Sequence, residues 1–107
     1  MKYRVNITVP AEGDLEDAYQ WIARDSSQAA ERWRKGLYRV IDSLETLPFR
    51  YGRAPEASAV DFELRQYVYK SHRILYTVIG DTVHILHIRH GARQLLKTHE
   101  IRRPTPQ

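Results

Sequence analysis

Two runs of alternating apolar residues, 72–79 and 82–90, dominate the last third of the chain, and only Gly80 and Asp81 separate them. Alternation with a period of two is typical of a strand that buries one face, and a two-residue connection of this kind predicts a tight β-hairpin. The rest of the chain must therefore fold so that it covers one face of this hairpin.

The turn also predicts how the two strands pair. Counting outward from it pairs Ile79 with Thr82, Val78 with Val83, Tyr76 with Ile85, Ile74 with His87 and His72 with Arg89. One face, suited to pack under helices, then holds Ile74, Tyr76, Val78, Val83 and Ile85, and the other holds Arg73, Leu75, Thr77, Leu86, Ile88 and His90. Whether Arg65 of the preceding strand shares a face with Arg73 depends on the loop around Lys70 and Ser71, and the sequence leaves both alternatives open.

The first half of the chain predicts a strand and two helices. Residues 3–9 alternate as a half-buried strand should, and Pro10 ends that strand. Apolar residues at helical spacing predict a first helix over residues 11–25 and a second that begins at Ser26 or Ser27, both of which are good capping residues. The short link between them predicts an antiparallel helical hairpin.

Residues 48–61 contain two prolines and one glycine without periodicity, so they predict a loop that crosses from the helices to the sheet. A strand over residues 62–69 then precedes the hairpin. The expected fold class is α+β, with an N-terminal strand and an antiparallel helical hairpin packed on an antiparallel β-sheet. We expect a single domain over residues 1–97 and a C-terminal tail, residues 98–107, that frays or docks only on a partner.

The excess of positive charge and all five histidines lie in the second part of the chain. From residue 62 onward eight Lys/Arg face three Asp/Glu, a formal charge of +5, whereas the first 61 residues carry nine Lys/Arg and ten Asp/Glu, a formal charge of −1. This asymmetry indicates an anionic partner, such as RNA, DNA or an acidic protein segment. The absence of cysteine excludes thiolate metal sites and cysteine nucleophiles. No apolar run is long enough for a membrane span, so we expect a cytoplasmic protein with no membrane partner.

Several short motifs follow one another over residues 3–97. They are Ala11, Asp14, Leu15 and Ile22 in the first helix, Leu44, Leu47 and Pro48 after the second, Gly52 and Arg53 in the crossing loop, Arg-Ile-Leu-Tyr at 73–76 and Ile-Arg-His-Gly-Ala-Arg at 88–93. In this order they resemble the RelE/ParE superfamily, the toxin halves of bacterial type II toxin-antitoxin pairs. The resemblance implies a small growth inhibitor that a cognate antitoxin holds silent in a hetero-oligomeric complex.

The resemblance implies one of two targets. RelE-like members cut messenger RNA on the ribosome, whereas ParE-like members lack that nuclease machinery and poison DNA gyrase. By resemblance, the nuclease branch keeps arginines at Arg73 and Arg93 and an acid or base for which His90 or His99 could stand. It also tends to place lysines in the preceding strand, where only Arg65 is basic here. We therefore favour a ParE-like gyrase inhibitor, with the ribosome-dependent mRNA endonuclease as the alternative.

Metal-independent RNA cleavage needs a base for the 2'-hydroxyl, a cation for the phosphate and an acid for the leaving oxygen. Arg73 and Arg93 could supply the cation, because a guanidinium binds phosphate oxygens in a bidentate manner. His90 or His99 could carry the proton. The predicted target-binding set, with or without catalysis, is Arg65, Arg73, Arg89 and Arg93.

No metal or cofactor is expected. His84 and His87 point to opposite faces of their strand, as do His87 and His90, so the three histidines cannot converge on one ion.

The N-terminal strand is expected at a sheet edge, where its unpaired backbone could accept a strand from the antitoxin. The predicted antitoxin-binding residues are Tyr3, Val5, Ile7 and Trp21, of which Trp21 falls off the main apolar stripe of its helix. A further alternative is a non-catalytic basic module that binds nucleic acid and needs no protein partner.

Overall fold

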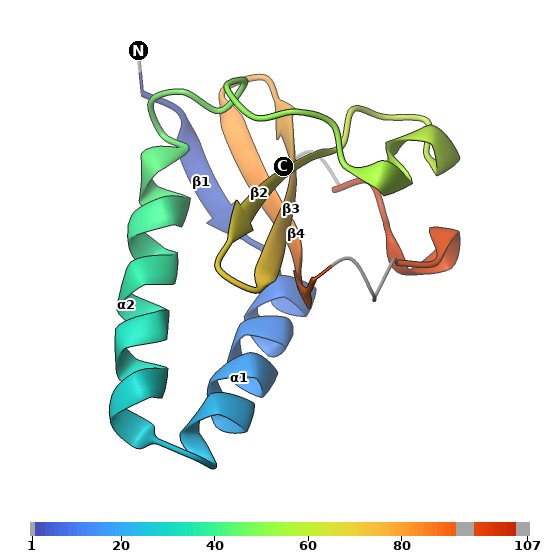
Figure 1. Ribbon diagram of the computed structural model, residues 1–107. Helices are drawn as coiled ribbons and strands as arrows, with labels where there is room; N and C mark the ends of the chain where they lie inside the picture. Colours follow the sequence, from blue (N-terminus) through green and yellow to red (C-terminus); the bar gives the residue numbers. More distant parts are fainter. Residues whose placement is uncertain (1, 92–95, 105–107) are drawn as a thin grey trace.

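The computed structural model describes residues 2–91 and 96–104. In chain order its elements are β1 (Arg4–Ile7), α1 (Val9–Ala23), α2 (Ser27–Ser43), the 3-10 helix η1 (Pro55–Ala59), β2 (Arg65–Tyr69), β3 (His72–Ile79), β4 (Thr82–His90) and the 3-10 helix η2 (Thr98–Glu100). The two long helices form a hairpin beside the sheet, and the two short 3-10 helices lie on the side away from them (Figure 1). The predicted α+β fold with a helical hairpin on a sheet is confirmed.

The sheet has the strand order β1-β4-β3-β2, so β1 is an edge strand as expected. Strands β2, β3 and β4 pair in antiparallel fashion, whereas β1 pairs with β4 in parallel, with Arg4 beside Thr82 and Ile7 beside Ile85. The sheet is therefore mixed rather than purely antiparallel. β1 can pair with β4 in parallel because both helices and two strands lie between them in the chain. This connection is much longer than the dozen or so residues that a parallel crossover needs.

The pairing counted from the turn is right for the first part of the hairpin and wrong beyond it. Val78 pairs with Val83 and Tyr76 with Ile85, but the register then shifts between Leu75 and Tyr76. Ile74 pairs with Ile88 instead of His87, and His72 pairs with His90 instead of Arg89. Leu86 is the extra residue of a β-bulge, which reverses the faces of all β4 residues that follow it.

Side-chain caps explain where the helices begin. The Thr8 hydroxyl accepts a hydrogen bond from the Ala11 N–H at 3.4 Å, and the Ser26 hydroxyl accepts one from the Ala29 N–H at 3.1 Å. Each cap satisfies a main-chain donor that the first helical turn leaves without a partner. Helix α1 thus begins two residues before the predicted position. No helix in the described part of the chain is both long and apolar enough to cross a membrane.

Apolar side chains are buried on both faces of the sheet. The core under the helices is formed by Ala11, Leu15, Trp33, Leu37, Ile41, Leu44, Ile74, Tyr76, Val83, Ile85 and Ile88. A second core on the other face is formed by Ala54, Ala57, Leu64, Leu75, Leu86, Leu96 and Ile101. The second core includes residues near the C-terminus, so residues 96–101 pack on the sheet, whereas a frayed tail was expected from residue 98.

Candidate functional site

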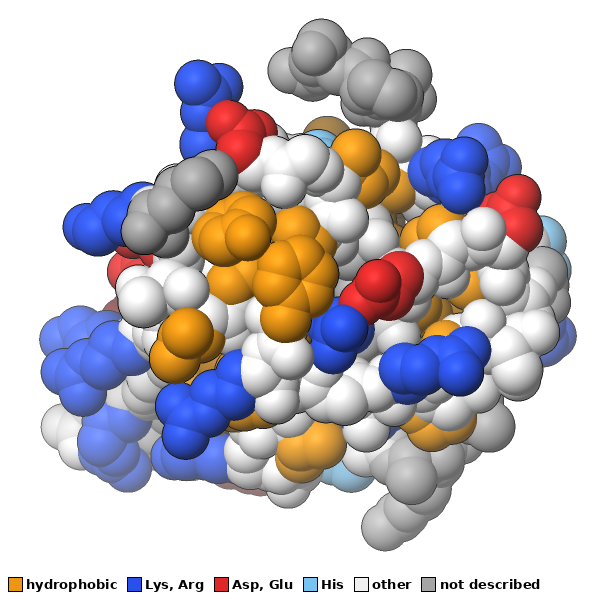
Figure 2. Space-filling view, turned by 90° about the horizontal axis from the view of Figure 1, so that it is seen from above, with side chains coloured by type: hydrophobic (Ala, Val, Ile, Leu, Met, Phe, Trp, Pro, Cys, Tyr) orange, Lys and Arg blue, Asp and Glu red, His pale blue; other side chains and the backbone are white. Residues whose placement is uncertain are grey.

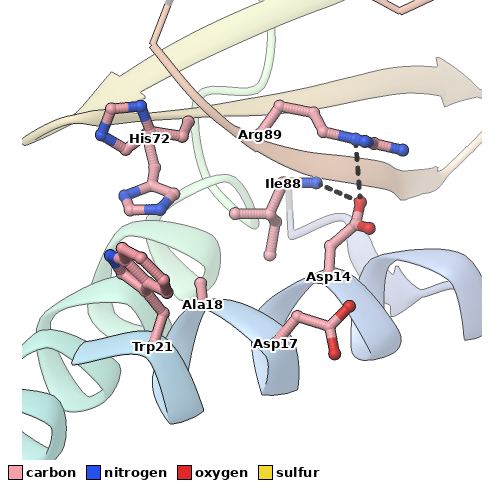
Figure 3. Close-up of a pocket in the computed structure, with 8 residues that line it drawn as sticks. Asp14, Asp17, Ala18, Trp21, His72, Ile88 and Arg89 are labelled. Carbon is pink, nitrogen blue, oxygen red and sulfur yellow. Dashed lines mark hydrogen bonds and ion pairs between the residues drawn. The ribbon is translucent and has the colours of Figure 1, made fainter. Parts of the chain in front are cut away.

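An open pocket of about 560 Å³ lies between α1 and the ends of β3 and β4. Its lining residues are Asp14, Asp17, Ala18, Trp21, His72, Ile88, Arg89 and His90. In Figure 3 the α1 side chains project from one wall toward the strand residues of the other. We call this feature the α1–β4 groove.

The helix wall of the groove follows from spacing in α1. Asp14, Ala18 and Trp21 stand at positions i, i+4 and i+7, which share one helical face. Ala18 is small, so the helix presents a shallow floor between an acidic end at Asp14 and an aromatic end at Trp21. The Trp21 side chain is 68% exposed and lies under the Arg24 guanidinium, 5.3 Å from the ring centroid. A tryptophan this exposed beside a hollow is typical of a partner-binding surface.

The bulge in β4 supplies the strand wall. Because His90 pairs with His72, the two imidazoles share the helix-facing side, with ring centroids 5.2 Å apart. The His72 ring also packs edge-on against Trp33 at 5.1 Å. Burial lowers the pKa of His72, and the neighbouring His90 lowers it further, so His72 is neutral at pH 7. His72 thus supplies a polar, uncharged edge to the groove, and His90 places a second imidazole at its rim.

Asp14 of α1 contacts the last part of β4, beyond the residues that pair with β1. Its Oδ2 accepts hydrogen bonds from the Ile88 N–H at 3.0 Å and from His87 Nδ1 at 2.9 Å, and it lies 3.7 Å from Arg89 Nε. Arg89 also bonds to Glu100 at 3.2 Å. Arg89 was predicted to bind the target. It is half-buried, and both of these carboxylates hold its guanidinium inside the fold.

Arg73 lies in the interior, on the face of the sheet that points away from the two long helices. Only 3% of the residue is exposed, and its guanidinium forms a bidentate pair with Glu56 at 2.9 and 2.7 Å. It also donates to Gln66 Oε1 at 3.0 Å and to the Gly91 carbonyl at 3.0 Å. Burial would raise the pKa of Glu56, but Arg73 and the Leu96 N–H outweigh it and lower the pKa. This geometry is that of a buried structural ion pair.

Arg65 is on the helix-facing side, because it pairs with Tyr76 whereas Arg73 pairs with Val68. The question left open by the sequence is thereby answered: Arg65 and Arg73 do not share a face. The Arg65 guanidinium forms an ion pair with Glu63 and donates to the Tyr51 carbonyl at 2.6 Å.

The remaining predicted groups are distributed around the fold. His90 is exposed at the rim of the groove, and His99 is exposed in η2. Arg93 lies outside the described residues. The structure therefore brings Trp21, Arg89 and His90 to one groove. Arg89 also pairs with the buried Arg73 across β3 and β4, whereas Arg65 lies on the other face of the sheet.

Tyr3, Val5 and Ile7 are partly buried and pack against the core under the helices. Arg4 and Thr8 donate their N–H groups toward the β4 side, to Asp81 at 2.8 Å and Ile85 at 3.1 Å. The alternate residue Val5 consequently directs its main-chain groups to the outer edge. The Tyr3 N–H is already bonded to the Glu45 carbonyl at 2.7 Å, so Val5 and Ile7 are the predicted antitoxin-binding residues of β1 whose main-chain groups face this outer edge without that bond.

Sequence reasoning missed Asp14, Asp17, Ala18, His72 and Ile88 as groove residues. The i, i+4, i+7 spacing in α1 is a signal that could have identified the helix wall. The strand wall depends on the bulge at Leu86, for which we find no signal in the sequence.

Comparisons with known proteins agree with this fold. The family model described as the ParE toxin of the type II toxin-antitoxin system parDE matches residues 5–95. The toxin RelE1 of Caulobacter vibrioides is 30% identical over 96 residues, which cover 88% of this chain and 99% of that protein.

Two solved structures are similar in fold. One is the chromosomal ParDE toxin-antitoxin system from P. aeruginosa, with a TM-score of 0.69 and 16% identity over 84% of this chain and 97% of that one. The other is the toxin-antitoxin complex RelBE2 from Mycobacterium tuberculosis, with a TM-score of 0.62 and 21% identity over 86% of this chain and 94% of that one. Together with the family match, the fold and the relative show that this chain belongs to the ParE toxin family of type II toxin-antitoxin systems, within the RelE/ParE superfamily.

Proposed function

We propose that this toxin inhibits growth by binding DNA gyrase in a ParE-like manner, without catalysis of its own. The observation that carries the proposal is the burial of Arg73 against Glu56. RNA cleavage would need a cation within reach of the phosphate and a proton carrier beside it. The guanidinium of Arg73 faces Glu56 on one side of the sheet, whereas the imidazole of His90 lies on the other side. The match to the ParE toxin family over residues 5–95 supports the same branch.

The second candidate is a ribosome-dependent mRNA endonuclease, and the observation that favours it is the relative named toxin RelE1. In that case Arg93 and His99 would carry the reaction, with His90 at the rim of the groove as a further proton carrier. This alternative predicts that Arg93→Ala abolishes message cleavage in a translating extract while the protein remains folded.

We further propose that a cognate antitoxin neutralises the toxin by covering two surfaces. One is the outer edge of β1, which can accept an extended segment through main-chain hydrogen bonds. The other is the α1–β4 groove, where Trp21 would fit against an apolar side chain of the antitoxin. Beside the start of β1, Leu47 and Phe49 are half-exposed, and Figure 2 shows hydrophobic side chains gathered at this end of the molecule. Tyr3 packs against Phe49 with the ring centroids 6.0 Å apart, so this patch is continuous with the β1 edge.

Two assays on one preparation test the proposed target. The purified toxin should block supercoiling of relaxed plasmid by gyrase and leave translation of a reporter message intact. Addition of the small protein encoded beside the toxin gene should restore supercoiling. Cleavage of the message in the translation assay, with supercoiling unaffected, would contradict the gyrase proposal and support the mRNA endonuclease.

A further inference from the structure

His87 lies in β4 directly after the bulge, and it touches three parts of the fold at once. The residue is only 7% exposed. Its Nδ1 lies 2.9 Å from Asp14 Oδ2 in α1, and its Nε2 lies 2.8 Å from the main-chain carbonyl of Glu100 in η2. The imidazole thus connects the first helix, the sheet and the C-terminal segment.

Both partners of this ring are hydrogen-bond acceptors. A main-chain carbonyl oxygen only accepts, and an ionised carboxylate also only accepts. The same Asp14 Oδ2 also receives the Ile88 N–H at 3.0 Å and lies 3.7 Å from Arg89 Nε, so this oxygen acts as an acceptor. A neutral imidazole has one N–H and could satisfy one of its two partners, whereas an imidazolium satisfies both. The geometry therefore fits a proton on each nitrogen.

The charges around the ring are compatible with this. Asp14 faces it from α1, Glu100 from η2 and Arg89 from β4 itself. Two carboxylates thus meet one guanidinium, and a protonated His87 balances the cluster. His99 is exposed and lies beside Glu100 in η2. The β3 residue paired with the ring is apolar.

We propose that protonated His87 is a latch that holds residues 96–101 against α1 and β4, and that loss of its proton to solvent releases this segment. The neutral ring would leave either the Asp14 carboxylate or the Glu100 carbonyl without its donor, and a buried polar group without a partner is strongly unfavourable. Release of the segment would uncover the second core, to which Leu96 and Ile101 belong. It would also change the Asp14 end of the α1–β4 groove. The latch does not depend on which molecule the toxin attacks.

The direction of the pH dependence follows from the contacts. The hydrogen bond that His87 donates to Asp14 raises the pKa of His87, against burial, which alone would lower it. A group whose pKa is higher in the folded state stabilises that state fully below its unfolded pKa of about 6.5, and the contribution disappears as pH rises through the folded value. The latch is therefore closed in mildly acidic solution and opens on the alkaline side.

Nitrogen-detected NMR of the histidine rings tests the protonation state directly. At pH 6 both ring nitrogens of His87 should be protonated, and they should lose one proton at a higher pH than those of the exposed histidines. Amide exchange of residues 96–101, corrected for the intrinsic effect of pH, should accelerate over the same pH range. A neutral His87 at pH 6, or unchanged protection as the ring titrates, would overturn the proposal.

Variants separate the latch from general stability. His87→Gln can donate from one end only, so protection of residues 96–101 at pH 6 should fall about tenfold or more, the factor that a hydrogen bond to a charged group contributes. In this variant the protection of residues 96–101 should no longer depend on pH over the range in which His87 titrates. His84→Gln is the matched control, because His84 lies on the same strand and bonds to Asn6 rather than to the C-terminal segment. If His87→Gln fails to fold, Asp14→Asn gives a second test: it should lower the pH at which His87 titrates, and an unchanged midpoint would contradict the proposal.

Discussion

Removal of the Arg73 guanidinium should lower the free energy of unfolding by more than removal of an exposed arginine would. Arg73 and Glu56 are 3% and 5% exposed, and two hydrogen bonds at 2.9 and 2.7 Å join them. In Arg73→Ala the Glu56 carboxylate would stay in the interior with main-chain N–H groups, those of Leu96 and of Glu56 itself, in place of a charged partner. A buried charge left in this way costs about 3–5 kcal/mol. Such a loss is a large share of the stability of a typical domain, about 5–15 kcal/mol.

The size of the effect is measurable by urea and thermal unfolding followed by circular dichroism. Each kcal/mol lowers Tm by about 4–8 °C in a domain of this size, so Arg73→Ala should lose about 12 °C or more. Arg32→Ala removes an exposed arginine of α2 and should stay within about 0.5 kcal/mol of the parent protein. The double variant Arg73→Met with Glu56→Leu removes both charges and should regain much of the loss.

This result bears on how toxicity assays are interpreted. If Arg73→Ala is unstable, its loss of toxicity reflects a smaller folded fraction and says nothing about a nuclease. The reasoning would be refuted if Arg73→Ala unfolded at the urea midpoint of the parent protein and still lost its toxicity. That outcome would mean that the guanidinium acts on the target rather than on Glu56.

Three further predictions concern α1, α2 and the core. Gly36→Ala should cost about 1–3 kcal/mol by urea unfolding, because a Cβ would lie 2.1 Å from the Tyr69 hydroxyl oxygen. Gly13→Ala is its control: it meets nothing within 4 Å, and it should stabilise α1 by about 0.5–1 kcal/mol. Trp21→Ala should leave the urea midpoint unchanged yet weaken antitoxin binding about tenfold or more in calorimetry, as loss of an interface anchor does; equal affinity would remove the groove from the interface. Burial raises the pKa of Tyr76 to about 12, so Tyr76→Phe should not alter the phenolate absorbance of the folded protein below pH 11, and a change there would show that the ring is accessible.

Local patterns predicted most of the elements of this fold. The strands at 72–79 and 82–90 are found as expected, because alternation and a two-residue turn act within one short stretch. The parallel pairing of β1 with β4 joins residues almost eighty positions apart. Alternation in β1 shows that the strand has one buried face, but it carries no information about which strand lies beside it.

The candidate site was harder to predict than the fold. Trp21 was recognised because it departs from the apolar stripe of α1. The bulge at Leu86 could not be recognised from the sequence. It moves Ile88 to the helix-facing side and brings His90 beside His72. Arg73 was expected to bind the target. Glu56 lies in a segment without periodicity, so no pattern indicated that its carboxylate would fold over the sheet and pair with Arg73.

The central claim is that this toxin stops growth by binding gyrase and not by cutting messages. The most direct measurement is pulse labelling of DNA and protein synthesis in cells during the first minutes after the toxin is induced. We predict that thymidine incorporation falls first while methionine incorporation continues, and that co-expression of the antitoxin prevents the fall. Methionine incorporation that falls first, with DNA synthesis still running, would contradict the claim.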